Sequence, residues 1–205
     1  MTQPSRPDAG PESKESIRQR ILRVRQGLSR GEIAYRSELA YRQFLTNLDR
    51  IRPPRAKCAA LYYPIRGEVD VGSFFRFFQA RGFSCAFPRM GSMGLDFFTV
   101  RSCEELKISR FGIGEPQPRP GTSPVDPDIV IVPAIAFSYD GYRIGFGAGH
   151  YDRTVARWIQ DGKRSSIQMI GLAYDFQVVP TFSHESHDQP LDAILTETTF
   201  RKRET

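Results

Sequence analysis

The stretch Arg143-Ile-Gly-Phe-Gly-Ala-Gly-His-Tyr-Asp-Arg153 holds three alternating glycines, Gly145, Gly147 and Gly149. Glycine has no Cβ atom, so it adopts positive φ without strain and lets backbone amides approach a ligand closely. The residues that follow, Tyr151–Ile159, predict a helix, so the loop ends at a helix N-terminus, where free amides and the helix dipole favour an anion. The pattern therefore predicts either a phosphate-binding loop or a tight structural turn, because glycine serves both.

A buried strand is predicted directly before this loop. The segment Asp128–Phe137 begins with the β-branched run Ile129–Val132, which is typical of a strand covered on both faces of a parallel sheet. Strand, glycine loop and helix then follow in the order in which open α/β sheets bind ligands. The loop is not a Walker loop, because no Gly-Lys-Ser/Thr follows its glycines. Arg143, Asp152 and Arg153 at its flanks favour phosphate together with a metal ion.

The length and composition predict one globular domain. A chain of 205 residues is long enough for one substantial core, and 40% hydrophobic residues with 15 Phe and 8 Tyr are typical of a soluble protein. Since neither a signal peptide nor a long apolar run is visible, we expect a cytoplasmic protein without a membrane partner. The net charge of +6 suits nucleic acid and polyanionic small ligands equally. Cys58, Cys85 and Cys103 form no motif and predict free thiols.

Helices and strands alternate along most of the chain, which predicts an α/β fold of three layers, α/β/α, with a mainly parallel central sheet and N-terminal helices. We expect a disordered tail at residues 1–12, a single domain at 13–200 and a charged C-terminal tail at 201–205. The first helix has an expected apolar face of Ile17, Ile21, Val24 and Leu28, and the capping box Ser29-Arg-Gly-Glu32 starts the second. Further strands are expected at Lys57–Tyr63, Phe83–Pro88, Leu95–Val100, Met169–Tyr174 and Ala193–Thr196, with a helix at Val71–Arg81 for which Asp70 is the candidate cap.

Lys14 and Arg18 lie one turn apart at the start of the first predicted helix. Two neighbouring cations oppose the helix dipole there, so an anion that docks on them would explain the pair; two solvated surface cations are the alternative. Glu68 lies in a loop at the carboxyl end of a predicted strand. Such a carboxylate is either solvated or part of a ligand site, because ligand groups gather at that edge of an α/β sheet.

A second candidate metal cluster lies between the last two predicted strands, where His184, His187, Asp188 and Asp192 are close in sequence. Two histidines three residues apart can share zinc, but no helix aligns them and no third His or Cys ligand is identified nearby. Carboxylates beside nucleotide phosphates suit Mg²⁺ better, because that ion keeps its waters and takes only one or two protein oxygens.

Seven ordered segments together resemble the 5-formyltetrahydrofolate cyclo-ligase family, also called methenyltetrahydrofolate synthetase. The segments are Lys14 to Arg18, Leu61 to Val69, Phe87 to Arg89, Gly112 to Pro116, Asp128 to Arg153, Gly171 to Gln177 and His187 to Glu197. The resemblance implies ATP-dependent closure of 5-formyltetrahydrofolate, with or without a polyglutamate tail, to 5,10-methenyltetrahydrofolate. It implies that the formyl oxygen is phosphorylated, that N10 then attacks the activated carbon, and that ADP and phosphate are released.

The resemblance also implies roles for individual residues. Catalytic roles fall to Lys14, Arg143 and Tyr151. Contacts to ATP fall to Lys14, Arg18, Arg143, Ile144, Gly145, Phe146, Gly147, Ala148, Gly149, His150 and Tyr151. Contacts to folate fall to Tyr63, Glu68, Phe146, Gly147, Ala148, Gly149 and His150. The implied Mg²⁺ ligands are Asp152 and Asp188.

The loop departs from the family pattern at two positions. Ala148 stands where the family commonly has Lys, and His150-Tyr151 where it has Tyr-Tyr, which puts nucleotide affinity in doubt. His150 is expected either as a neutral packed ring or as an imidazolium that replaces part of the lost charge. Two competing functions stay open: a nucleic-acid-binding member of the same fold without catalysis, and an ATP-dependent small-molecule kinase. We expect a monomer and no nucleic-acid partner.

Overall fold

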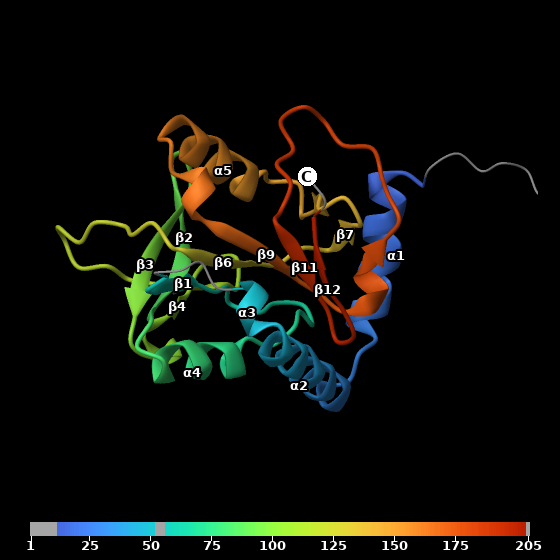
Figure 1. Cartoon of the computed structure of the whole chain (residues 1–205), viewed down its shortest axis with the longest axis horizontal. Coiled ribbons are helices and arrows are strands. Elements are labelled where there is room, and N and C mark those ends of the chain that lie inside the picture. Colours follow the sequence, from blue (N-terminus) through green and yellow to red (C-terminus); the bar gives the residue numbers. More distant parts are fainter. Residues whose placement is uncertain (1–11, 52–55, 204–205) are drawn as a thin grey trace, which may run out of the picture.

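The structure is a computed structural model that describes residues 12–51 and 56–203 (Figure 1). Its centre is a seven-stranded sheet in the order β12-β11-β9-β6-β1-β2-β3. The five inner strands pair in parallel, and each edge strand pairs antiparallel with its neighbour. The strands are β1 (Cys58–Ala60), β2 (Ser84–Gly91), β3 (Gly94–Val100), β6 (Ile129–Val132), β9 (Gln168–Leu172), β11 (Ala193–Leu195) and β12 (Phe200–Lys202).

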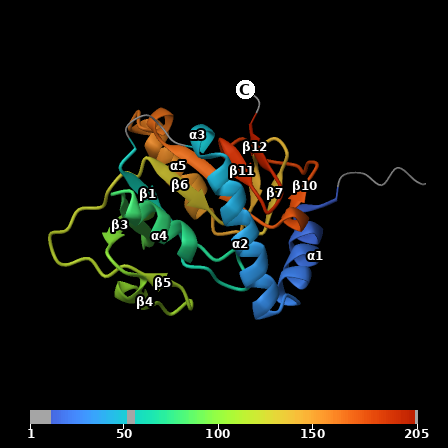
Figure 2. The same cartoon turned by 60° about the horizontal axis from the view of Figure 1, so that its bottom comes forward.

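Helices cover both faces of this sheet, which confirms the mixed α/β fold with a mainly parallel sheet (Figures 1 and 2). One face carries α2, α3 and α4, and the other carries α5; α1 lies at one side, next to β7. The helices are α1 (Lys14–Gln26), α2 (Arg30–Thr46), α3 (Leu48–Ile51), α4 (Gly72–Ala80) and α5 (His150–Gln160). The part of the chain that the structure describes contains no helix long and apolar enough to cross a membrane.

Smaller elements complete the fold. A three-stranded sheet β10-β7-β8 (Val178–Val179, Ala136–Ser138, Arg143–Ile144) holds the entrance to the glycine loop, and β4 (Lys107–Ile108) pairs with β5 (Gly114–Glu115). Three 3₁₀ turns lie at η1 (Cys103–Glu105), η2 (Arg164–Ser166) and η3 (Asp175–Gln177).

Three apolar clusters hold these layers together. Phenylalanines of α2 and α4 form the largest, in which the Phe44 ring lies 5.0 Å from both Phe74 and Phe77. Trp158 of α5 packs on the opposite face, where it stacks on Phe97. The third cluster joins Ile17 and Ile21 of α1 to β7 and β8. The helix α1 is therefore fixed to the small sheet that leads into the glycine loop.

Several local predictions are confirmed. The capping box of α2 is present, since Ser29 Oγ accepts from the Glu32 amide and Glu32 accepts from the Ser29 amide. The helix after the glycine loop begins at His150. The three cysteines are free thiols, with Cys58 and Cys85 on inner strands.

Three local predictions were wrong, and a fourth falls almost entirely outside the described residues. Val24 is 46% exposed, whereas Arg25 is fully buried, because residues 17, 21 and 25 are four apart and continue one stripe of α1. Val71, not Asp70, is the N-cap of α4, although Asp70 Oδ1 accepts from the Gly72 amide. The predicted C-terminal tail does not begin at 201, because Arg201 and Lys202 pair with β11 as part of β12. The predicted tail at 1–12 lies outside the described residues except for Glu12, whose carboxylate accepts from Ser16 and Arg20.

Candidate active site

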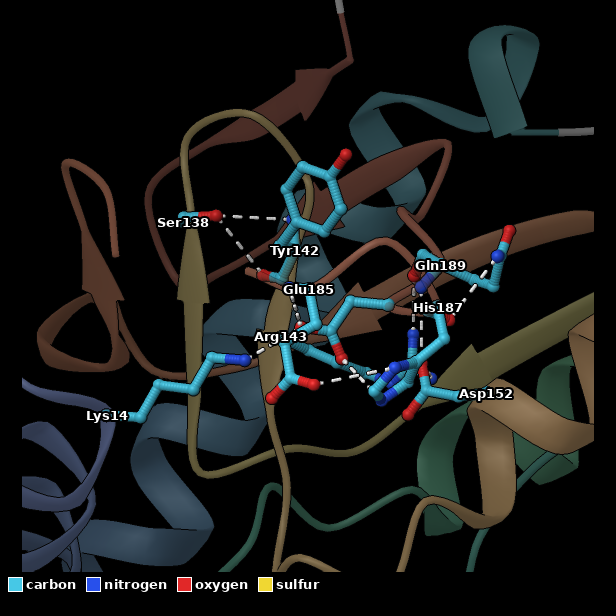
Figure 3. Close-up of polar contacts among 9 residues, drawn as sticks. Lys14, Ser138, Tyr142, Arg143, Asp152, Glu185, His187 and Gln189 are labelled. Atoms are coloured by element: carbon cyan, nitrogen blue, oxygen red, sulfur yellow. Dashed lines mark hydrogen bonds and ion pairs between the residues drawn. The ribbon is translucent and has the colours of Figure 1, made fainter. Parts of the chain in front are cut away.

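Three segments distant in sequence meet beside the glycine loop: the start of α1, the unit from β8 to the first turn of α5, and residues 185–189 (Figure 3). They bring four charged side chains together in two ion pairs, Lys14 with Asp188 and Arg143 with Asp152. The predicted cations and carboxylates therefore belong to one site.

The Arg143 side chain is the buried centre of this cluster, with 6% of its surface exposed. Its Nη2 donates to Asp152 Oδ1 at 2.7 Å, and its Nη1 donates to the Gln189 carbonyl at 2.8 Å. The Gln189 amide donates to the same Asp152 oxygen at 3.2 Å. Asp152 is thereby bonded to the residue that follows Asp188, so the two implied metal ligands are neighbours.

Lys14 reaches the other carboxylate, since its Nζ donates to Asp188 Oδ2 at 2.7 Å. The same oxygen accepts from the Glu185 amide. Burial alone raises the pKa of Asp188, but the bonds from Lys14 and Glu185 outweigh it and lower the pKa below its ordinary value. Asp188 is thus held as a carboxylate, and the four side chains carry two positive and two negative charges.

The donor set at Asp152 and Asp188 fits Mg²⁺. Within the described residues, Asp152 Oδ2 and Asp188 Oδ1 accept no hydrogen bond, and His187 Nε2 lies 4.0 Å from Asp188 Oδ1. Each carboxylate thus keeps one oxygen for an ion that takes one or two protein oxygens beside phosphates.

The histidines considered for zinc have other partners. His184 stacks on the Tyr142 ring with centroids 3.7 Å apart, and Asp192 pairs with Arg164 and accepts from the Met169 amide. No group of three His, Cys, Asp or Glu side chains able to hold a metal occurs among residues 12–51 and 56–203.

The glycine loop is held open by contacts from both sides. Gly147 and Gly149 have φ of 93° and 64°, values that favour glycine, and Gly149 is the N-cap of α5. Arg18 Nε donates to the Gly145 carbonyl at 3.1 Å, and Arg153 Nη1 donates to the Ala148 carbonyl at 2.8 Å. These arginines bind carbonyls of the loop, and no side chain among the described residues caps the N-terminus of α5, so the amides of its first turn remain available for an anion.

His150 lies at the first position of α5, with its Nδ1 2.9 Å from Arg153 Nη2. Burial and the Arg153 charge lower its pKa. Without a nucleotide, the neutral ring is therefore favoured over the imidazolium considered from the sequence.

Thr154 fastens this first turn of α5 to the sheet, a role that the sequence did not indicate. Its buried Oγ1 accepts from the Leu95 amide at 2.7 Å and donates to the His150 carbonyl at 2.8 Å. Gly94 makes this approach possible, because a Cβ at that position would lie 2.5 Å from Thr154 Oγ1. The hairpin of β2 and β3 thus positions the glycine loop.

The model of the 5-formyltetrahydrofolate cyclo-ligase family matches residues 11–197. The chain belongs to this family. It is 29% identical to the 5-formyltetrahydrofolate cyclo-ligase of Haemophilus influenzae over 189 residues, which cover 90% of this chain and 97% of that relative. The seven segments therefore predicted the family correctly, and the chain is an enzyme.

Solved structures agree with this assignment. The NMR structure of Aquifex aeolicus 5,10-methenyltetrahydrofolate synthetase superimposes with a TM-score of 0.71 at 31% identity, covering 94% of this chain and 93% of that chain. The Mycoplasma pneumoniae 5,10-methenyltetrahydrofolate synthetase gives a TM-score of 0.69 at 27% identity, covering 91% and 99%.

The residues implied by the cyclo-ligase family for folate come from two segments: Tyr63 and Glu68 follow β1, and residues 146–150 form the glycine loop and the first residue of α5. Glu68 is buried, and its Oε2 accepts from the Ile65 amide at 3.0 Å. Tyr63 packs so closely on Gly114 that a Cβ there would lie 2.5 Å from the Tyr63 ring. Phe146 is 44% exposed at the edge of the glycine loop, with the Arg66 guanidinium 4.9 Å from its ring centroid. Phe146 thus lies close to Arg25 and Arg66, the two arginines that act on Glu68.

Tyr151 lies between the two groups of residues. The Arg143 guanidinium is 5.6 Å from the centroid of its ring. Burial raises the pKa of Tyr151, with Arg143 opposing and Glu68 adding to that rise. Its phenol is therefore protonated at neutral pH and can donate a hydrogen bond, but cannot act as a base.

Proposed function

We propose that this protein converts 5-formyltetrahydrofolate to 5,10-methenyltetrahydrofolate in a reaction that consumes ATP and releases ADP and phosphate. The observation that carries this proposal is the meeting of Lys14, Arg143, Asp152 and Asp188 at the N-terminus of α5. Cations, carboxylates and free helix amides are together the groups that a nucleotide triphosphate with its metal ion needs.

In this proposal, Lys14, Arg18 and Arg143 bind the ATP phosphates together with the amides of residues 145–150. These groups hold the terminal phosphate in line with the formyl oxygen of the folate, so that transfer to that oxygen turns it into a leaving group. The chain supplies positioning and neutralisation of phosphate charge rather than covalent chemistry. Ala148 offers no cation, so Arg143 must neutralise more of the phosphate charge than it would if a lysine stood at position 148.

Asp152 and Asp188 would hold Mg²⁺ through Asp152 Oδ2 and Asp188 Oδ1, the carboxylate oxygens that are not used in the ion pairs with Arg143 and Lys14. When bound, the ion neutralises the phosphates and fixes their orientation. Lys14 and Arg143 then exchange part of their contact with the carboxylates for contact with phosphate oxygens, and so offset part of the phosphate charge that Mg²⁺ leaves.

On the folate side, Glu68 accepts hydrogen bonds from the pterin edge, which offers adjacent N–H donors. Tyr63 and Phe146 supply flat apolar surface for the ring. This arrangement holds N10 near the activated formyl carbon. Closure of the ring then needs attack by N10, loss of the N10 proton and departure of the oxygen as phosphate. The Tyr151 phenol, protonated and beside Arg143, is placed to donate a hydrogen bond to the developing charge.

The test is to incubate the protein with 5-formyltetrahydrofolate and MgATP, and to follow the near-ultraviolet absorbance of the methenyl product together with free phosphate. The proposal predicts equal amounts of both. ATP consumption with a stable phosphorylated product would indicate a kinase instead. Absence of turnover, with tight binding of RNA or DNA that weakens steeply with salt, would indicate the nucleic-acid-binding alternative.

We further propose that the protein acts as a monomer in the cytoplasm and takes folates with or without a polyglutamate tail. Size-exclusion chromatography tests the first point. Comparison of KM for mono- and polyglutamylated substrate tests the last.

A further inference from the structure

Arg25 occupies the point of the central sheet where the strand order changes direction. From β1 the chain continues to β2 on one side, and later adds β6, β9 and β11 on the other side. In open α/β sheets, ligands bind in the crevice outside the carboxyl ends of the two strands at such a point. Here these strands are β1 and β6, and Arg25 enters between the segments that follow them.

The contacts of Arg25 bridge those two segments. Its Nε donates to the Arg66 carbonyl after β1 at 3.0 Å, and its Nη1 donates to the Ala134 carbonyl after β6 at 3.1 Å. Its Nη2 lies 3.7 Å from Glu68 Oε1, too far for a hydrogen bond, and has no hydrogen-bond partner among the described residues. A fully buried arginine thus directs one unpaired donor toward the buried carboxylate.

In the described part of the chain, Glu68 accepts one hydrogen bond, from the Ile65 amide. The charged and titratable groups that act on it come from four elements: Arg25 on α1, Arg66 in its own loop, Tyr62 after β1 and Tyr151 on α5. Burial raises the pKa of Glu68 to about 7, whereas Arg25, the Ile65 amide and Arg66 oppose the rise, in that order. Arg25 is therefore the strongest influence that keeps this side chain charged.

We propose that Arg25 is a positioning residue, which keeps Glu68 as the carboxylate that accepts hydrogen bonds from the pterin ring. This inference rests on the proposed function, because it takes Glu68 as the folate acceptor. Arg25 has no exposed surface, so it acts through Glu68 and not by touching the substrate. A protonated Glu68 would present a donor to the N–H groups of the pterin and lose the interaction.

A purely structural role is the competing explanation, since Arg25 also joins the Arg66 and Ala134 carbonyls. The two explanations differ in pH dependence. Loss of a structural link changes stability and activity at every pH. Loss of the charge beside Glu68 moves the pH at which folate binding fails.

The experiment measures kcat/KM for 5-formyltetrahydrofolate against pH in the wild type, Arg25→Met and Arg25→Lys. Removal of an opposite charge at this range raises the pKa of a carboxyl by about 1 to 3. In Arg25→Met, the low-pH limb of the profile, where kcat/KM falls as Glu68 is protonated, should therefore move to higher pH by at least about one unit. At pH 7 the charged fraction of Glu68 then falls from about one half to about one eleventh, so kcat/KM drops at least about fivefold through KM. Arg25→Lys retains the charge and should restore the wild-type limb.

Arg36→Met is the matched control. Arg36 is also an arginine on an N-terminal helix that pairs with a buried carboxylate, Glu197, at 2.9 Å, but it is not among the groups that act on Glu68. Its loss should leave the limb in place. In a Glu68→Gln background, Arg25→Met should likewise leave the shape of the pH profile unchanged, because no carboxylate remains to titrate.

Carboxyl titration provides a readout that does not need turnover. Infrared difference spectra of the wild type minus Glu68→Gln follow the protonation of Glu68 directly, and the same subtraction in the Arg25→Met background should give a midpoint at higher pH. If Arg25→Met is folded and the midpoint of Glu68 protonation does not move, the proposal is overturned. It is likewise overturned if Arg25→Lys lowers kcat/KM by the same factor at every pH. If the protein fails to form the methenyl product while the midpoint moves, the proposed function is wrong and the coupling of Arg25 to Glu68 stands.

Discussion

The link between Thr154 and the β2–β3 hairpin gives a prediction whose magnitude follows from the structure. Thr154→Val keeps the shape of the side chain but removes Oγ1, and with it the acceptor of the Leu95 amide. Gly94 packs against the same atom, so no water has room to replace it. An unsatisfied buried amide costs about 1–3 kcal/mol, and we expect the free energy of unfolding to fall by that amount.

Urea denaturation measures this loss as a lower midpoint with an unchanged m-value. Thr99→Val is the control, because Thr99 is exposed on the same strand β3 and its substitution should change stability by less than about 0.5 kcal/mol. A loss for Thr154→Val that is no larger than for Thr99→Val would show that the Leu95 amide does not depend on Thr154. The KM for ATP should rise as well, since Thr154 also holds the first turn of α5.

Four further predictions concern the charged groups of the site. Lys14→Ala should raise the KM for ATP about tenfold or more, which corresponds to ~1.4 kcal/mol. Lys163→Ala is the control: it breaks an equally short ion pair, with Asp126 at 2.7 Å, and should leave this KM unchanged. Equal effects of the two substitutions would remove Lys14 from the site. Asp152→Asn should keep the fold, as circular dichroism would report, but lose activity, with partial recovery at high Mg²⁺; full activity at low Mg²⁺ would exclude Asp152 as a ligand. The pKa of Glu68 is higher in the folded state than in the unfolded state, so the stability that Glu68 contributes should be present below pH 4.5 and be lost as pH rises through about 7, in total ~3 kcal/mol. Chemical denaturation of the wild type and Glu68→Gln across this pH range measures that loss. A difference in unfolding free energy that stays constant with pH would contradict the prediction. The pKa of His150 is lowered, so the wild type and His150→Tyr should show the same pH dependence of KM for ATP from pH 7 to 9. An ATP affinity that weakens over this range in the wild type but stays constant in the variant would contradict a neutral His150 ring.

Elements with local signals were predictable from the sequence. The capping box Ser29–Glu32 fixed the start of α2, and the β-branched run of β6 followed by alternating glycines predicted the strand, loop and helix around the site. These patterns depend on contacts within a few residues, so they do not require knowledge of the rest of the fold. The resemblance to the family implied a role in one site for both Lys14 and Asp188, but their ion pair was found only in the structure.

Other features depend on partners that the local sequence does not contain. Arg25 is buried because carbonyls at 66 and 134 accept its donors, although spacing from Ile21 could have placed it on the buried stripe. The strand β12 resembles a charged tail, since Arg201 and Lys202 are exposed, and only its pairing with β11 makes it a strand. Gln189 carries no sequence signal, because it binds Asp152 and Arg143 through its backbone.

The ion pair between Lys14 and Asp188 spans 174 residues of sequence, which has a consequence for how the chain reaches its folded state. At ribosomal rates of about 5–20 residues per second, Asp188 is made roughly 10–35 s after Lys14. The hairpin of β2 and β3 closes over a few residues and can form early, whereas Lys14 must wait for the segment after β10 before it finds its partner Asp188. A ligand that Lys14 and Asp188 hold together binds only the finished chain, so its binding adds stability at the last step of folding and at no earlier one.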